Sequence, residues 1–170
     1  MNAATAEAGD LLSLYQEIIL EHGKRPRNAR AVEHATCSAA GNNPLCGDRV
    51  TVTARVDGGV IADVGALAKG CAISVASASL MTEVLKGRST ESAARLFKAV
   101  KDLCTGTTGL EAAKAAAGAD LGDSVERLAA LSGVSQFPVR VKCATLPWHA
   151  LMSCLAGGGA ATTETPAAPG

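Results

Sequence analysis

Residues 50–60 read Val-Thr-Val-Thr-Ala-Arg-Val-Asp-Gly-Gly-Val, and the rest of the chain can be arranged around this stretch. Valine and alanine alternate with threonine and arginine, which is the period-two pattern of a strand with one buried face. Asp57-Gly58-Gly59 is a strong hairpin turn, and residues 60–68 suit a returning strand. The sequence therefore predicts an antiparallel hairpin with strands at 50–56 and 60–68.

Both ends of this hairpin carry reactive side chains. Cys46 and Asp48 lie just before the first strand, and Cys71 lies just after the second. Because a hairpin brings its two ends together, Cys71 is expected near Cys46 and Asp48. In an extended segment, residues i and i+2 point to the same face, so Cys46 and Asp48 are themselves expected to converge.

Apolar residues at helical spacing predict helices on both sides of the hairpin. A proline fits best in the first turn of a helix, so Pro147 indicates that the last helix begins at about Ala144 and ends near Leu155. The sequence predicts one α+β domain with a small antiparallel β-sheet packed by helices. Its expected segments are a disordered N-terminus at 1–9, a domain at 10–155 that contains a flexible insertion at about 104–122, and a disordered tail at 156–170.

Three cysteines and one aspartate are candidate metal ligands. Cys71 and Cys143 are each expected at a helix N-terminus, where unpaired N–H groups favour the thiolate. With Cys46 and Asp48 they would make a tetrahedral site of three sulfurs and one oxygen, which favours zinc or iron–sulfur chemistry over magnesium or calcium. The other cysteines are expected to be packing residues or idle thiols, with the first of them in a loop: Cys37, Cys104 and Cys154.

The role of Arg140, three residues before Cys143, stays open between two alternatives. Arg140 can reach back to Asp48 or to a persulfide, or it can form a surface salt bridge. His149 lies six residues past Cys143, so we expect an exposed side chain rather than a ligand. Trp148 is expected to pack in the core.

Charge and composition narrow the range of partners. The chain has 16 basic and 16 acidic residues, and this balance argues against nucleic acid or an anionic membrane as the main partner. No apolar run approaches the ~18 residues that a membrane helix requires, and the first residues do not read as a secretory signal. A cytoplasmic location is therefore expected. In a reducing compartment, six cysteines indicate metal binding or thiol chemistry rather than disulfides.

Three blocks of sequence together resemble a known family. The sequence is similar, from about Leu11 to Leu155, to the SufU-type iron–sulfur cluster assembly proteins of the IscU/NifU-like scaffold superfamily. The blocks are Gly41-Asn42-Asn43-Pro44-Leu45-Cys46-Gly47-Asp48, Lys69-Gly70-Cys71-Ala72-Ile73-Ser74-Val75-Ala76-Ser77-Ala78-Ser79 and Phe137-Pro138-Val139-Arg140-Val141-Lys142-Cys143-Ala144-Thr145-Leu146.

This resemblance implies an IscU/NifU-like fold and a set of metal or cluster ligands, namely Cys46, Asp48, Cys71 and Cys143. The IscU branch has a histidine immediately before the third cysteine, where this sequence has Lys142. Lys142 and the insertion at 104–122 are both similar to the SufU branch. Pro147 departs from the non-proline residue usual in the family.

The resemblance to the SufU branch implies a zinc-dependent sulfurtransferase. Such a protein accepts persulfide sulfur from a SufS-type cysteine desulfurase and passes it to a SufBCD-like assembly complex. We expect Cys46 to be the acceptor, because a loop residue can swing away from the metal without unwinding a helix. The alternative is a scaffold on which a [2Fe-2S] cluster is assembled and transferred.

Overall fold

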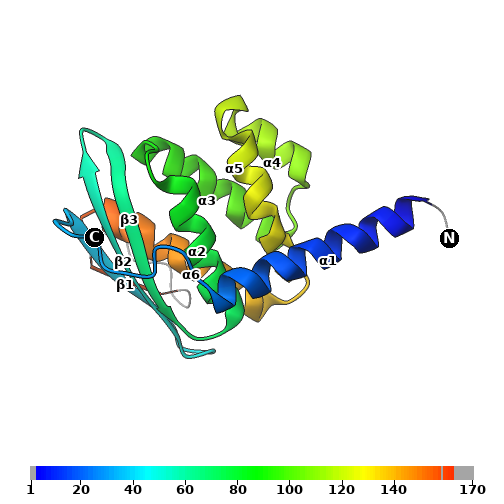
Figure 1. Ribbon diagram of the computed structural model, residues 1–170, viewed down its shortest axis with the longest axis horizontal. Helices are drawn as coiled ribbons and strands as arrows, with labels where there is room; N and C mark the ends of the chain where they lie inside the picture. The colour runs from blue at the N-terminus through cyan, green and yellow to red at the C-terminus, as the bar shows by residue number, and fades with distance from the viewer. Residues whose placement is uncertain (1–2, 158, 163–170) are drawn as a thin grey trace.

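The computed structural model describes residues 3–157 and 159–162 of the 170-residue chain. A four-stranded sheet forms one layer, and helices cover one of its faces (Figure 1). The strand order is β3-β2-β1-β4. The strands are β1 (Cys37–Asn43), β2 (Asp48–Asp57), β3 (Val60–Lys69) and β4 (Gly159–Thr162).

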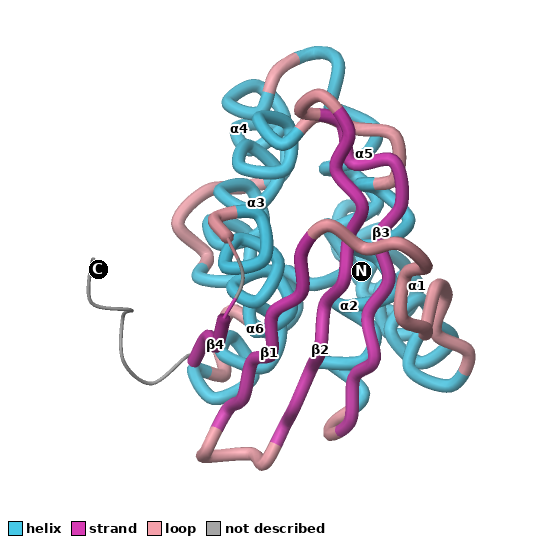
Figure 2. The backbone as a smooth tube through the Cα atoms, turned by 90° about the vertical axis from the view of Figure 1, so that its left-hand side faces the viewer, coloured by secondary structure: helices cyan, strands magenta, loops and turns pink. Residues whose placement is uncertain are grey.

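One helix precedes β1 in the sequence and the others lie between β3 and β4, and the sheet lies in front of several of them in Figure 2. None of the helices in the described part of the chain has the length and apolar character needed to span a bilayer. The helices are α1 (Ala3–Lys24), α2 (Ala72–Leu85), α3 (Thr90–Thr105), α4 (Leu110–Ala117), α5 (Gly122–Leu128) and α6 (Pro138–Leu155), with short 3-10 turns η1 (Ala119–Leu121) and η2 (Ala129–Val134).

The predicted hairpin is confirmed as β2 and β3, which pair antiparallel with Val50 opposite Ala68. The inward residues Val50, Val52 and Ala54 are buried against the helices. β1 pairs antiparallel with β2 and was not predicted. Its residues are mostly small or polar, Cys-Ser-Ala-Ala-Gly-Asn-Asn, so it lacks the apolar alternation that marks a strand in a sequence.

Helices α2 and α6 pack on the inner face of the sheet and on each other. Trp148 is fully buried, as expected, and its indole Nε1 donates a hydrogen bond to Ser77 Oγ at 3.2 Å. The Ser77 hydroxyl in turn donates to the carbonyl of Ala144. This pair of bonds fixes the middle of α6 against α2.

The predicted start of the last helix is wrong. α6 begins at Pro138, so Pro147 lies inside the helix and Cys143 lies in its second turn rather than at its N-terminus. Proline at 147 removes the hydrogen bond that this residue would donate to the carbonyl of Cys143. Ser77 contacts Ala144 before the proline and Trp148 after it, and these two hydrogen bonds help to hold the helix across this point.

The expected disorder is also corrected in three places. Residues 3–9 belong to α1, in keeping with the high helix propensity of their alanines. The insertion at 104–122 contains a short helix, α4, and it is packed rather than flexible, since Ala113, Ala117 and Leu121 are buried. Within the expected tail, residues 159–162 form β4, which pairs parallel with β1, whereas residues 163–170 lie outside the described part of the chain.

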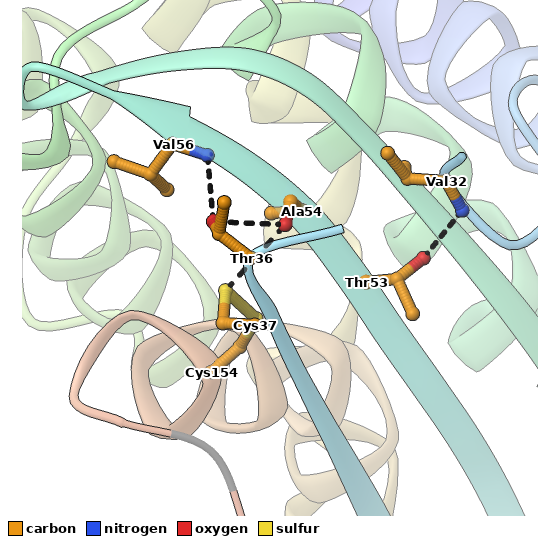
Figure 3. The surroundings of a disulfide bond; sticks show 7 residues. All are labelled: Val32, Thr36, Cys37, Thr53, Ala54, Val56 and Cys154. Atoms are coloured by element: carbon orange, nitrogen blue, oxygen red, sulfur yellow. Dashed lines mark hydrogen bonds between the residues drawn. A yellow bond between two sulfur atoms is a disulfide. The ribbon is translucent and has the colours of Figure 1, made fainter. Parts of the chain in front are cut away.

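Residues 25–36 connect α1 to β1 by crossing the outer face of the sheet. The amide of Ala66 on β3 donates to the carbonyl of Asn28 at 3.0 Å, and the amide of Val32 donates to Thr53 Oγ1 on β2 at 2.8 Å (Figure 3). A Cβ at Gly65 would overlap the carbonyl of Arg30, so only glycine permits this close approach. The crossover therefore covers the middle of the outer face.

A disulfide joins Cys37, the first residue of β1, to Cys154 near the end of α6 (Figure 3). The expectation that both were packing residues or idle thiols is wrong. β1 packs on α6, and this packing brings the two Cα atoms to 5.3 Å, within the range of a disulfide. The cross-link closes a loop of 117 residues, a separation at which the sequence carries no pairing signal.

Removing this cross-link should destabilise the protein. A chain-entropy estimate for a loop of this length is about 5 kcal/mol, and a loss of unfolding free energy up to this size is expected in a Cys37→Ser/Cys154→Ser variant. Urea unfolding followed by circular dichroism measures it. Reducing agent should lower the stability of the unmodified protein to that of the variant and leave the variant unchanged. Identical unfolding curves for both proteins without reductant would contradict the prediction.

Candidate metal centre

The loop between β1 and β2 carries Cys46, and Asn43 organises this loop. The carbonyl of Asn43 accepts hydrogen bonds from the amides of Cys46, at 3.2 Å, and Gly47, at 2.8 Å. Its side-chain Oδ1 accepts from the amide of Leu45 at 3.2 Å. Asn43 pairs with Asp48 across the strands, so the expected convergence of Cys46 and Asp48 arises from a hairpin turn and not from an extended segment. The Cys46 side chain is exposed at the tip of the hairpin.

Asp48 is fully buried and faces the end of β3. Its Oδ1 accepts a hydrogen bond from the amide of Cys71 at 2.9 Å, and its Oδ2 lies 3.6 Å from the Cys71 thiol. Cys71 is the N-cap of α2 and is half-buried. The argument from hairpin geometry, which put Cys71 beside Asp48, is therefore confirmed.

Cys143 closes the cluster from α6. Its side chain is buried, and its Sγ lies 3.4 Å from the Sγ of Cys46. Asn43 Nδ2 donates to the same sulfur at 3.8 Å. Burial raises the pKa of the Cys143 thiol well above its usual range, and hydrogen bonds to Asp48, Cys46 and Cys71 raise it further.

The donor set suits one tetrahedral ion. The Cys46 sulfur, the Cys143 sulfur and an Asp48 carboxylate oxygen all lie within 4.8 Å of one another, and the Cys71 sulfur lies 3.6 Å from Oδ2 of the same carboxylate. Metal–sulfur bonds of about 2.3 Å in a tetrahedron separate neighbouring sulfurs by about 3.8 Å. The 3.4 Å between Cys46 and Cys143 and the 3.6 Å between Cys71 and Asp48 are close to that spacing.

Two residues near this cluster were missed by sequence reasoning. Asn43 is fully buried and falls on the inward-facing side of β1 with Ala39 and Gly41. A polar residue at an inward position is the signal that could have identified it, but β1 was not predicted. Gly70 has a φ of +139°, and a Cβ there would overlap Oδ1 of Asp48.

Arg140 does not reach the cluster. It is exposed in the first turn of α6, and in the described part of the chain it makes no hydrogen bond or ion pair. It lines a groove of about 510 Å³ between α1, the start of α2 and η2, together with Ile73 and Phe137. Among the described residues, Arg140 makes neither the contact with Asp48 nor the surface salt bridge.

The remaining sequence candidates have packing roles. His149 is half-buried, not exposed, and contacts the ring of Phe97 edge to face at 5.1 Å between centroids. Burial and the nearby Lys101 lower the pKa of His149. Cys104 is buried, as its expected packing role requires, and burial raises the pKa of its thiol to about 12.

The close approach of Gly70 to Asp48 predicts a selective loss of metal binding. Gly70→Ala should displace the Asp48 carboxylate and weaken Co²⁺ binding by about 10–100-fold, the range typical of a disturbed ligand support. Gly47→Ala is the matched control, because φ is also positive there, at +72°, but a Cβ would meet nothing within 4 Å. Titration with Co²⁺, followed by its visible spectrum, compares the two variants. Equal affinities would count against this account of Gly70.

Comparison with known proteins agrees with this architecture. The chain is 41% identical over 142 residues to the zinc-dependent sulfurtransferase SufU of Bacillus subtilis, an alignment that covers 84% of this chain and 89% of the relative. It is 34% identical over 142 residues to the iron–sulfur cluster assembly scaffold protein IscU of Streptococcus pyogenes, which covers 84% and 82% of the two chains.

A solved structure and a family model extend this similarity to the fold. A crystal structure from Fervidobacterium islandicum, described as a candidate iron–sulfur cluster assembly scaffold protein for the SUF system, matches with a TM-score of 0.68 at 32% identity, over 82% of this chain and 94% of that one. The expected IscU/NifU-like α+β fold is thus confirmed. Residues 14–146 match the family model of the NifU-like N-terminal domain, and the chain belongs to that family.

Proposed function

We propose that this protein is a zinc-dependent sulfur-transfer protein of iron–sulfur cluster assembly. In this proposal Cys46, Asp48, Cys71 and Cys143 hold the zinc ion, and Cys46 accepts the sulfur. The observation that carries the proposal is the convergence of three thiols and one carboxylate at a site where a single thiol, that of Cys46, is exposed. The relative from Bacillus subtilis, named as a zinc-dependent sulfurtransferase, supports the same assignment.

The thiolates and the carboxylate have different roles in binding the zinc ion. Zinc bound here supplies positive charge that keeps the ligating thiols deprotonated at neutral pH. Asp48 is the hardest donor beside three soft sulfurs. Its second task is to accept the amide hydrogen of Cys71, which holds the N-terminus of α2 against the cluster. Asn43 supports the set by donating to Cys143 and by shaping the loop of Cys46.

The sulfur-transfer step is a thiolate attack on sulfur. The Cys46 thiolate attacks the outer sulfur of a donor persulfide, the sulfur–sulfur bond of the donor breaks, and the donor leaves as a thiolate. Cys46 then carries the persulfide, with no net oxidation. Exposure favours Cys46 for this role, because Cys143 is buried and Cys71 is half-buried at the N-cap of α2.

A SufS-type cysteine desulfurase is the proposed donor, and a SufBCD-like complex is the proposed acceptor. Arg140 is a candidate supporting residue, since its exposed guanidinium lies at the groove beside the start of α2 and can attract an anionic persulfide as it arrives. We place the reaction in the cytoplasm.

The second candidate function is a scaffold for a [2Fe-2S] cluster. The relative from Streptococcus pyogenes, named as an assembly scaffold, favours it, and three thiolates with a carboxylate can also hold iron. Colour and metal content separate the two functions. A colourless protein containing zinc supports sulfur transfer, whereas iron and visible absorbance after aerobic purification support the scaffold.

Removing the metal should destabilise the fold. The four donors come from the β1–β2 hairpin, the N-cap of α2 and helix α6, so the ion ties three parts of the chain together. A chelator should release about one zinc per chain and lower the melting temperature, as measured by metal analysis and calorimetry. Cys104→Ala, which leaves the donors intact, should bind and release zinc like the unmodified protein. A melting curve that does not change after zinc release would contradict this role.

The residue that carries the transferred sulfur tests the proposal that Cys46 is the acceptor. After incubation with a cysteine desulfurase and cysteine, mass spectrometry should find one added sulfur on the peptide that contains Cys46. Cys46→Ser should lose this label, and Cys104→Ala should keep it. If the label lies on the Cys143 peptide and Cys46→Ser still accepts sulfur, Cys46 is not the acceptor.

A further inference from the structure

The outer face of the sheet is bare at the end next to the metal centre. The crossover segment 25–36 covers Thr53 and Gly65, which face each other on β2 and β3. The next two pairs that face outward, toward the metal-centre end of the hairpin, are left uncovered. Thr51 faces Leu67, Arg49 faces Lys69, and all four residues are exposed.

Arg49 and Lys69 form an unfavourable pair. They lie directly opposite each other on adjacent antiparallel strands, where like charges destabilise a sheet. Neither makes an ion pair or a side-chain hydrogen bond within the described residues. The chain as a whole has no net charge, so this is a local excess of positive charge. The pair does not stabilise the fold, which suggests that these two residues contact another molecule.

Both cationic residues are close in sequence to proposed metal ligands. Arg49 follows Asp48, and Lys69 precedes Gly70 and Cys71. Because successive residues of a strand point to opposite faces, Asp48 faces inward to the cluster while Arg49 faces outward. Leu45, beside Cys46 at the hairpin tip, is 61% exposed, and Leu67 is 50% exposed. We call Leu45, Arg49, Leu67 and Lys69 the cationic patch.

We infer that the cationic patch docks an acidic surface of the protein that delivers sulfur to Cys46. This inference rests on the proposed function and names the chemistry of its partner: carboxylates opposite Arg49 and Lys69, and apolar side chains opposite Leu45 and Leu67. The exposed charges raise the rate of encounter, and the leucines supply apolar contact area. Beside the patch, β2 and β3 line a hollow of about 390 Å³ together with Pro26 and Arg27, which gives a partner side chain room to insert.

The substitution Lys69→Glu separates docking from stability. It replaces a repulsive pair across the strands with an attractive one, so the melting temperature should rise. It also removes a cation from the patch and adds an anion, so association with the purified cysteine desulfurase of the same organism should slow by roughly tenfold at low salt. The difference should shrink as salt is raised, because exposed charges are screened. Surface plasmon resonance and calorimetry measure the two effects.

The controls keep the inference distinct from the proposed function. Arg55→Glu changes the charge equally on the same face of β2, six residues or about 20 Å from Arg49, and should leave association within about twofold. Zinc content should stay normal in both variants, because neither residue is a proposed ligand. If the unmodified protein binds the desulfurase and Lys69→Glu binds equally fast, the cationic patch is not the docking surface and sulfur transfer still stands. If the unmodified protein does not bind at all, both the inference and the proposed donor fail.

Discussion

The buried carboxylate of Asp48 is the constraint on which the site depends. A carboxylate taken out of water must be compensated by donors or by a metal. Asp48 receives the amide of Cys71 and lies among the three thiols, so the first residue of β2, the end of β3 and the start of α2 must meet at one point. Gly70 is part of this requirement, because any side chain there would occupy the place of the carboxylate.

The parts of this arrangement that local geometry determines could be predicted from the sequence. The alternation of Val50, Val52 and Ala54 identified β2, and the glycine turn fixed the partner strand. A hairpin necessarily brings its two ends together, so Cys71 was correctly placed beside Asp48. Cys46 followed from its position two residues before Asp48, although a tight turn rather than an extended segment brings it there.

The parts that depend on distant packing could not be predicted in this way. β1 is built from small and polar residues, so its burial and its pairing with β2 have no local pattern. Pro147 indicated a helix start, but hydrogen bonds that Ser77 on another helix makes with Ala144 and Trp148 support α6 around it. The disulfide of Cys37 with Cys154 likewise requires β1 to lie on α6. Each of these outcomes is set by tertiary contacts that override a local preference.

The disulfide also shortens the search by which the thiols of the centre find one another. Cys46 and Cys143 are 97 residues apart along the linear chain. Through the bond between Cys37 and Cys154 the path is nine residues on one side and eleven on the other. Loop closure becomes less probable with the three-halves power of length, so in an unfolded chain that keeps the cross-link the two thiols meet about ten times more often. In an unfolded chain that retains this bond, two of the four proposed ligands, Cys46 and Cys143, are therefore close together before any strand has formed.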